Sequence, residues 1–499
     1  MSNYDFDLII IGAGPGGYVT AARAAKMGLK TAIVEKGNWG GVCLNVGCIP
    51  TKTLLKNAKV YHYIDKDSDK YGITIKDKKN IEINWKVMQD RKAGVVKTLT
   101  GGVGFLMKSN KVEQLLGIGS AIDKNTILVK DKDGKEKKYT TKYMIIATGS
   151  KVKMFDNPDG PQGLSEKDLK MNQSLLTSTE ILSLTEVPKT LTIIGGGVIG
   201  VEFAALFSTL GSKVTVIEYA NRILSLLDED ISTTLTKILE KNGVKIITSH
   251  SVNELKDKTL TYYAATDKEH KKPLTVTSDY FLLSTGRTPV TAGFTNLGIQ
   301  IKPNQAFAVN NKLEALDTNN NVIDNIYVIG DANGQRMLAH VASTQGLAAL
   351  NNILVKEGRN DGYDLPLTEQ EVDYNKMPNC IYSFPEVASV GLTETECKSL
   401  NKEYLVKKIP FSINGKALAD GETDGFVKII IDKNYGEILG AHILCSTATD
   451  IIAEIVNIMQ TEGTIVELAS ACHPHPTMSE VVMDAAQDLE LEWYKVNKK

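Results

Sequence analysis

Two cysteines, Cys43 and Cys48, stand in the segment GGVCLNVGCIPTK, residues 40–52. Two thiols five positions apart in a segment that is not extended can meet the geometry of a disulfide. Pro50 suits the first turn of a helix that we expect to run to Val60, with Cys48 at its N-terminus. A helix N-terminus lowers a thiol pKa and stabilises the thiolate. The pattern therefore predicts a redox-active dithiol.

Half of a zinc site and a pair of small apolar core thiols are the alternatives for this segment. No second Cys/His pair in the sequence has zinc-like spacing, which favours redox chemistry and predicts no metal. Six cysteines among 499 residues are too few for a disulfide scaffold and indicate a reducing compartment. The other four have no motif partner and are expected to be structural thiols: Cys380, Cys397, Cys445 and Cys472.

Two stretches of the chain share one pattern around a glycine-rich loop. Each has an apolar strand, the loop, a helical stretch and a second strand, over residues 6–35 and again over residues 192–218. In both stretches an acid ends the second strand, 18 residues after the last loop glycine. This repeated order predicts two βαβ units.

The glycines of such a loop have separate physical tasks. The first allows a tight turn, the second lets the backbone approach a pyrophosphate, and the third lets the helix pack on the strand, while the helix N-terminus faces the anion. The acid accepts hydrogen bonds from a ribose. One such loop can be a purely structural turn, but two complete units favour two dinucleotide sites. The residues expected there are Gly12, Gly14, Gly17 and Glu35 at the first site, and Gly195, Gly197, Gly200 and Glu218 at the second.

Glu218 bears on the choice of nucleotide at the second site. A carboxylate can bond the 2′-hydroxyl of a ribose but repels a 2′-phosphate, so NAD is expected rather than NADP. A solvated acid at a strand end is the alternative, and the nearby Arg222 leaves NADP open.

Residues 143–149 and residues 280–286 are also similar in sequence. Each segment predicts a buried strand followed by a turn of small residues, which ends its repeat. The expected fold is α/β, with two doubly wound, Rossmann-like dinucleotide-binding domains and a C-terminal α+β domain. A polar linker is expected over 157–172. The expected boundaries are 1–150 for the first of these domains, 151–286 for the second, 287–362 for a segment completing the first, and 363–499 for the C-terminal domain.

Composition excludes several classes of protein. A chain of 499 residues with 42% apolar and 23% charged residues reads as a soluble globular protein of several domains. With a formal net charge of −2, neither nucleic acid nor a membrane surface is an expected partner. The weakly charged stretch 191–207 contains glycines and Glu202, so no membrane span is expected. No targeting segment is visible, which predicts a cytoplasmic location, or the mitochondrial matrix if a presequence was removed.

The wording of the motifs resembles the class I pyridine nucleotide-disulfide oxidoreductases. The resemblance joins the dithiol segment to GAGPGGY, GGGVIGVE, NIYVIGDANGQRMLAH, FPEVASVGLTE, GFVKI and HPHPTMSE across nearly the whole chain. It implies that 1–150, completed by 287–362, is an FAD domain with FAD at the first glycine loop, and that 151–286 is an NAD domain with NAD at the second. It also implies that 363–499 is a dimerisation domain. It also implies Lys52 beside the flavin, paired with Glu202, and Gly286 near the nicotinamide. Further FAD-contacting positions implied by it are Gly119, Gly149, Asp331 and Ala339.

The segment HPHPTMSE implies that His475 is the catalytic base and Glu480 its orienting partner, with His473 as a weaker rival for the base. An imidazole held in one tautomer can take a thiol proton near neutral pH. The resemblance places this pair on the other subunit, so it implies a homodimer.

The same resemblance implies the reaction dihydrolipoamide + NAD⁺ to lipoamide + NADH, with Cys43 as the interchange thiol and Cys48 facing the flavin. Partners would be lipoyl-bearing subunits of 2-oxo acid dehydrogenase or glycine cleavage complexes. One alternative is an NADPH-dependent reductase of glutathione or another small disulfide. Another is a flavin-bearing structural subunit with a silent site, which would have lost the dithiol or the His475–Glu480 pair.

Overall fold

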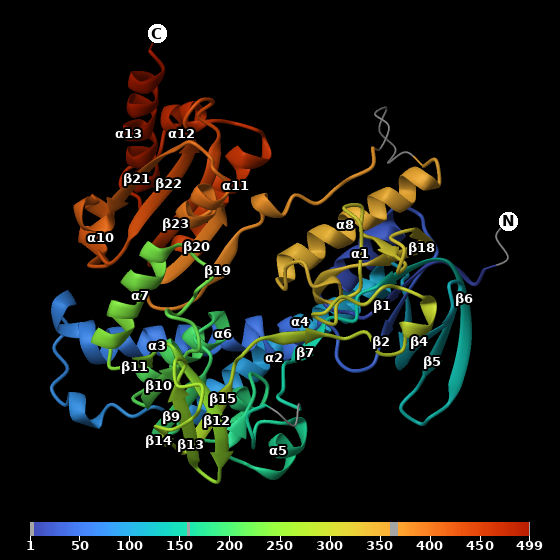
Figure 1. Cartoon of the computed structure of the whole chain (residues 1–499), viewed down its shortest axis with the longest axis horizontal. Coiled ribbons are helices and arrows are strands. Elements are labelled where there is room, and N and C mark those ends of the chain that lie inside the picture. Colours follow the sequence, from blue (N-terminus) through green and yellow to red (C-terminus); the bar gives the residue numbers. More distant parts are fainter. Residues whose placement is uncertain (1–3, 157–159, 360–367, 499) are drawn as a thin grey trace. The chain divides into compact units, whose positions relative to one another are not determined.

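The structure is a computed structural model, and it describes residues 4–156, 160–359 and 368–498. Three residues of the predicted linker and the predicted boundary after residue 362 lie outside that part. Figure 1 shows the chain coloured along its sequence, with its helices and strands labelled. Contacts within the chain divide it into two compact units. Unit 1 comprises residues 1–53, 87–153 and 286–372, and unit 2 comprises residues 54–86, 154–285 and 373–499. The four predicted domain ranges stay predictions.

Unit 1 contains the first doubly wound sheet, in the order β17-β18-β6-β1-β2-β3. The four strands β18, β6, β1 and β2 run parallel, and β3 continues them. The segment after residue 286 supplies β18 and thereby joins the N-terminal sheet. The strands are β1 (Phe6–Ile11), β2 (Thr31–Glu35), β3 (Glu113–Leu116), β4 (Ile118–Asp123), β5 (Thr126–Lys130), β6 (Glu136–Ile146), β17 (Glu314–Leu316) and β18 (Val322–Val328).

The central strand β1 explains why this sheet is parallel and covered on both faces. Leu8, Ile9 and Ile10 are all fully buried, as in strands that have helices or further strands on each side. Leu8 and Ile10 belong to one apolar cluster and Ile9 to another. Helices α1 (Pro15–Lys26) and α8 (Ala339–Lys356) pack together in unit 1.

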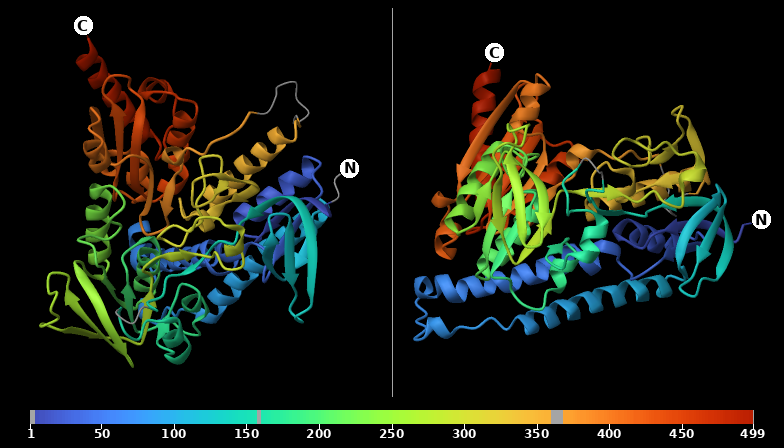
Figure 2. Two further views of the ribbon diagram at one scale, coloured as in Figure 1. Left: turned by 45° about the vertical axis from the view of Figure 1, so that its right-hand side comes forward. Right: turned by 60° about the horizontal axis from the view of Figure 1, so that its bottom comes forward.

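Unit 2 holds the second parallel sheet, in the order β11-β10-β9-β15-β8. Its loop and helix follow β9, as the repeat predicts. A separate antiparallel sheet of β12, β13 and β14 is drawn in yellow-green in Figure 2. The elements are β8 (Leu175–Leu176), β9 (Thr190–Ile194), α6 (Val198–Thr209), β10 (Lys213–Ile217), α7 (Glu229–Lys241), β11 (Lys245–Ile247), β12 (His250–Lys256), β13 (Thr259–Ala264), β14 (Leu274–Thr277) and β15 (Tyr280–Leu283).

The stretch expected to be a linker contains ordered structure where it is described. Ser165 and Asp168 form a capping box at the start of α5 (Glu166–Met171). Leu164 is fully buried and Gln162 pairs with Glu254 of β12. The stretch therefore packs on the small antiparallel sheet instead of only connecting two domains.

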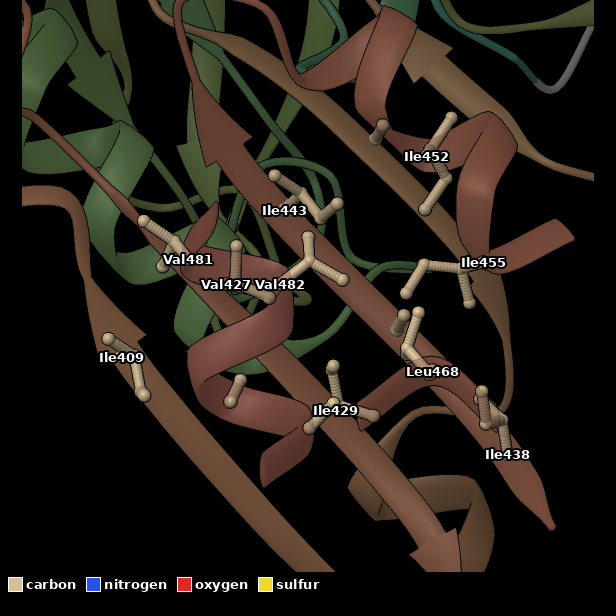
Figure 3. Close-up of a cluster of buried hydrophobic side chains, with 14 of the residues drawn as sticks. Ile409, Val427, Ile429, Ile438, Ile443, Ile452, Ile455, Leu468, Val481 and Val482 are labelled. Carbon is tan, nitrogen blue, oxygen red and sulfur yellow. The ribbon is translucent and has the colours of Figure 1, made fainter. Parts of the chain in front are cut away.

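The C-terminal part of unit 2 is an antiparallel sheet covered by helices, which confirms the predicted α+β arrangement. Figure 3 shows Ile429 and Ile443 of the sheet packed with helix residues such as Ile455 and Val482. The sheet order is β19-β20-β23-β22-β21. The elements are β19 (Asn379–Ile381), β20 (Glu386–Gly391), α9 (Glu394–Ser399), β21 (Tyr404–Pro410), β22 (Phe426–Asp432), β23 (Ile438–Cys445), α11 (Ala448–Gln460), α12 (Ile465–Ser470) and α13 (Glu480–Asn497). None of the helices in the described residues has the length and apolarity needed to cross a bilayer.

Candidate active site

The two cysteines of the predicted dithiol lie on consecutive helices. Cys43 is on α2 (Gly41–Val46), and Cys48 is the first residue of α3 (Cys48–His62). Both are half-buried thiols, and a hydrogen bond joins their sulfurs. The structure thus brings the pair together and confirms that Cys48 begins a helix.

The proximity of the two sulfurs governs their ionisation. The hydrogen bond with Cys48 raises the pKa of Cys43, and burial and the negative charge of Cys48 raise it further, while the Lys52 charge opposes them. Two neighbouring thiols resist losing both protons because the second thiolate would lie beside the first. The reduced pair therefore favours one thiol beside one thiolate over two thiolates.

Helix α2 is docked directly on the first glycine loop. The Gly40 amide donates to the Ala13 carbonyl at 2.9 Å. A Cβ added to Gly41 would lie 2.7 Å from the Cα of Gly14, so only glycine permits this approach. The helix that carries Cys43 therefore packs directly against the first dinucleotide loop within unit 1.

The first loop has the geometry that a pyrophosphate needs. Gly12 has φ +108°, and a Cβ on Gly17 would lie 1.9 Å from the Gly12 carbonyl oxygen. No heavy atom lies within 4 Å of the corresponding position on Gly14, and no side chain caps the helix that begins there. Glu35 accepts hydrogen bonds from the amide of Ala13 at 2.9 Å and from the amide of Gly37 at 2.8 Å. An anion can approach the free amides of this helix start.

The second loop repeats this arrangement in unit 2. Gly195 has φ +105°, a Cβ on Gly200 would lie 2.1 Å from its carbonyl oxygen, and the space beside Gly197 is open. Glu218 accepts from the Gly196 amide at 2.6 Å and from the amide two positions after the acid at 2.7 Å. The predicted residues of each loop are thus brought together around an uncapped helix start.

Arg222, the residue that left NADP open, is held by the backbone. Its guanidinium donates to the carbonyls of Leu227 at 2.9 Å and Ser225 at 3.0 Å. These bonds direct its donors to the loop itself, so the charge next to the ribose position is that of Glu218. This arrangement fits a 2′-hydroxyl better than a 2′-phosphate.

Asp331 lies in the short 3₁₀ helix Gly330–Asn333 that follows β18, and it belongs to a network that the sequence predicted only in part. It accepts a hydrogen bond from the Ser150 hydroxyl and forms an ion pair with Arg287 at 3.8 Å. Arg287 also donates to the Ser150 hydroxyl at 2.6 Å and carbonyl at 2.7 Å. Burial lowers the pKa of Arg287, and the charges of Asp331 and Cys48 oppose that effect. Its position directly after Gly286, in the repeated strand-turn, was the available signal.

Tyr18 is a second residue that the sequence reasoning did not select. Burial raises its pKa, and the negative charges of Cys43 and Cys48 raise it further, which places its phenol near the dithiol. Its signal is its place immediately after Gly17 on α1.

The remaining predicted cofactor positions have matching surroundings. Ala339 begins α8, whose first turn has no side-chain cap and no acid. Gly149 and Gly286 have φ +72° and +118° with open space beside them. A Cβ on Gly119 would lie 3.0 Å from a side-chain carbon of Val34, so its visible role is close packing. Contacts of these residues with FAD or NAD stay predictions.

His475 and Glu480 form the predicted pair. The Nδ1 atom of His475 lies 2.8 Å from Oε1 of Glu480, whose other oxygen accepts from the Thr477 amide at 2.8 Å. The Thr477 amide first, and His475 second, lower the pKa of Glu480. The His475 side chain is 79% exposed in the single chain, which leaves its Nε2 edge accessible.

His473, the rival base, has a structural setting. Its side chain is 5% exposed, and its two nitrogens are engaged by Glu454 of α11 and, at 2.9 Å, by the Ala471 carbonyl. Both nitrogens are thus committed, so His475 is the histidine that can act as a base. Glu454 was missed because no motif marks it.

Glu202 on α6 is 4% exposed and accepts from the Tyr382 amide at 3.0 Å, so it is a buried acid and not an exposed charge on the helix surface. Its pairing with Lys52 stays a prediction.

Among the described residues no cluster of three or more His, Cys, Asp or Glu side chains is placed to hold a metal. Of the other four cysteines, two are buried and Cys380 is half-buried, but Cys472 is exposed, so the expectation of a packed structural thiol is wrong there.

Two family models match this chain. Residues 6–346 match the pyridine nucleotide-disulphide oxidoreductases, and residues 377–486 match the dimerisation domain of the same family. The chain belongs to the pyridine nucleotide-disulphide oxidoreductase family. Members of the family use FAD and NAD(H), and the two glycine loops fit these two groups. The dimerisation domain indicates a homodimer.

Relatives span the whole chain. The dihydrolipoyl dehydrogenase of Mycoplasma pneumoniae is 40% identical over 491 residues, covering 98% of this chain and 100% of the relative. The dihydrolipoyl dehydrogenase of Bacillus subtilis is 38% identical over 495 residues, covering 97% of each. Among solved structures, the Cu(II) complex of the HOCl-induced flavoprotein disulfide reductase RclA from Escherichia coli has a TM-score of 0.81 at 25% identity, covering 98% and 100% of the two chains.

Proposed function

We propose that this chain oxidises protein-bound dihydrolipoyl groups to lipoyl groups and reduces NAD⁺ to NADH. The observation that carries the proposal is the docking of the dithiol helix on the first dinucleotide loop, where the Gly41 and Gly14 backbones touch. The choice of the lipoyl group rests on the relatives named dihydrolipoyl dehydrogenase.

The chemistry begins with the Cys43–Cys48 pair as a disulfide. The imidazole of His475 takes the proton of one dihydrolipoyl thiol, and the resulting thiolate attacks the Cys43 sulfur. The Cys43–Cys48 bond breaks, a mixed disulfide forms at Cys43, and Cys48 leaves as a thiolate at the start of α3. That leaving group is favoured because the helix N-terminus stabilises its charge.

The second substrate thiol completes the oxidation. It attacks the substrate sulfur bonded to Cys43, which closes the lipoyl disulfide and releases Cys43. Cys43 keeps the second proton, because the neighbouring Cys48 sulfur raises its pKa. The substrate has then lost two electrons and two protons, and the chain holds one thiol, one thiolate and a protonated His475.

Glu480 supports the base by its bond to Nδ1, which directs the other nitrogen of His475 outwards. Bound FAD, held at Gly12, Gly14, Gly17 and Glu35, supplies the two-electron transfer from the dithiol to NAD⁺ held at the second loop. Lys52 and Glu202, with Gly119, Gly149, Gly286, Asp331 and Ala339, complete the proposed cofactor contacts.

The exposure of His475 bears on how many subunits form one active site. Since the ring faces solvent in the single chain, we place it, with Glu480, in the site of the partner subunit, where it completes the dithiol site. The lipoyl-bearing subunits of 2-oxo acid dehydrogenase or glycine cleavage complexes are the proposed partners, and a cytoplasmic location is the proposed compartment.

An NADPH-dependent reductase of glutathione or another small disulfide is the second candidate. Glu218, with Arg222 directed to the backbone, favours NAD over it. The test follows absorbance at 340 nm with dihydrolipoamide and NAD⁺, with dihydrolipoamide and NADP⁺, and with oxidised glutathione and NADPH. We expect turnover in the first mixture, and turnover in the last mixture alone would overturn the proposal.

A further inference from the structure

The two dinucleotide loops of this chain differ in their intrinsic stiffness. The first reads Gly12-Ala13-Gly14-Pro15, with an alanine and a proline that restrict the backbone. The second reads Gly195-Gly196-Gly197-Val198, with three consecutive glycines. Over six positions each loop has four glycines, because Gly16 and Gly17 complete the first and Gly200 completes the second. The difference in stiffness therefore comes from Pro15, which fixes its own φ in the first loop, and from the unbroken run of three glycines in the second.

The backbone that flanks the two loops is equivalent. In the first unit the Ala147 amide donates to the Ile11 carbonyl at 2.9 Å, and in the second the Ser284 amide donates to the Ile194 carbonyl at 2.9 Å. A Cβ on Gly12 would lie 2.3 Å from the Ala147 carbonyl oxygen, and a Cβ on the corresponding Gly195 would lie 2.7 Å from that of Ser284.

The side chains at these equivalent positions differ. The hydroxyl of Ser284 lies 2.9 Å from the Gly195 carbonyl oxygen and 3.0 Å from that of Ile194. It also lies within 3.0 Å of a Cβ built on Gly200, on the far side of the turn. Ala147 has no hydroxyl with which to make such bonds.

We infer that Ser284 is a positioning residue that holds the triple-glycine loop in the shape that binds the NAD pyrophosphate. The hydroxyl holds the Gly195 carbonyl in place. The amides of the loop then stay directed at the pyrophosphate position beside the helix N-terminus. It replaces the stiffness that Ala13 and Pro15 give the first loop. This inference rests on the proposed use of NAD and concerns nucleotide affinity, with no part in the dithiol chemistry.

The test compares Ser284→Ala with Ser278→Ala in the FAD-loaded full chain. Ser278 has a buried hydroxyl bonded to that of Thr192 at 2.7 Å, outside both loops, so its loss also removes one buried hydrogen bond. The measurements are the Kd of NADH and of ADP-ribose by titration calorimetry, and the KM values for NAD⁺ and dihydrolipoamide. ADP-ribose has the pyrophosphate but lacks the nicotinamide.

For Ser284→Ala we expect the Kd of both ligands and the KM for NAD⁺ to rise by about three- to tenfold, the usual effect of one lost hydrogen bond. The KM for dihydrolipoamide and kcat at saturating NAD⁺ should stay within about twofold, because the loop binds without taking part in chemistry. Ser278→Ala should leave all nucleotide affinities unchanged.

Unchanged ADP-ribose affinity in Ser284→Ala would overturn the inference, and so would an equal loss in both variants, which would mean general loosening of unit 2. Failure of the wild type to bind NADH would overturn the proposed function and this inference together. Wild-type NADH binding without dihydrolipoamide oxidation would overturn only the substrate, because ADP-ribose still reports on the loop.

Discussion

At the scale of single residues, the hydrogen-bond partners and the pKa of a side chain in this site depend on one neighbouring side chain. His473 and His475 stand two positions apart, but Glu454 occupies the first ring and Glu480 orients the second. In the dithiol, the Cys48 sulfur raises the pKa of Cys43. Residues of the same type thus have different surroundings, and we propose different tasks for them on that ground.

The base assignment predicts a large loss of turnover in His475→Gln. Without an imidazole to take the thiol proton, kcat for dihydrolipoamide oxidation should fall by about 10²–10⁴-fold. Steady-state kinetics over a range of pH will check this. The KM for NAD⁺ should stay close to the wild-type value, and a variant that keeps wild-type kcat would assign the proton transfer to another group.

The charge of Glu218 predicts the nucleotide preference. Glu218→Gln keeps an acceptor oxygen but removes the negative charge, so discrimination against NADP⁺ should fall by about tenfold. The ratio of kcat/KM for NAD⁺ and NADP⁺ measures it. Glu35→Gln is the matched control from the first loop and should leave that ratio unchanged. An unaltered ratio in Glu218→Gln would contradict the role of the charge.

At the scale of elements, unit 2 contains a buried ionic cluster that joins α7 to the antiparallel sheet. Lys428 of β22 is 2% exposed and contacts Asp228 at 2.9 Å, Asp230 at 2.8 Å and Glu394 at 2.6 Å. The carboxylates come from the start of α7 and from α9. The buried ammonium thus contacts three acids from distant parts of the chain, and Lys408 pairs with Asp230 as well, at 2.8 Å.

Removal of that ammonium should destabilise the fold. Lys428→Met leaves Asp228 buried without its counter-charge, which costs about 3–5 kcal/mol of unfolding free energy. Urea unfolding followed by circular dichroism will measure it. Lys433→Met breaks an exposed pair with Glu403 and should cost less than about 1 kcal/mol. Equal midpoints for the two variants would contradict the expected importance of the cluster.

The same cluster predicts a dependence of stability on pH. Burial alone would raise the pKa of Asp230 and Glu394, but hydrogen bonds from Lys428 and from Lys408 or Tyr404 lower them. Acids with a depressed folded pKa stabilise the fold above their unfolded values of about 4, and this contribution is lost as pH falls through the folded pKa. Lys428→Met should therefore lose less stability between about pH 5 and pH 3 than the wild type. Parallel urea curves at both pH values would decide it, and equal losses would count against the cluster.

At the scale of the whole molecule, the proposed active site needs two chains. His475 is exposed in the single chain, and the residues around it belong to the part that matches a dimerisation domain. In a closed two-fold dimer, each chain gives the same residues to the other. The dithiol of one subunit would then work with the base of its partner.

Complementation of inactive variants tests this arrangement. Heterodimers of Cys48→Ser and His475→Gln chains, purified through two different tags, should recover about half of the wild-type activity, because one of their two sites is intact. Each variant homodimer serves as the control and should be inactive. Heterodimers without activity would place both groups in one chain.

The sequence alone determined everything that depends on local spacing. The dithiol, the two glycine loops with their acids, and the His475–Glu480 pair lie within short segments whose residue types set their own backbone. The repeated units and the buried strands also follow from pattern, so the α/β architecture was predictable.

The tertiary structure decided what depends on contacts between distant segments. Arg287 reaches Ser150 across 137 residues, and Lys428 reaches Asp228 across 200. Ser284 reaches the Gly195 loop across 89 residues. No local pattern reports such contacts, because side chains meet only after the sheets have formed. The same physical reason explains why the contact of Glu454 with the His473 ring could not be predicted.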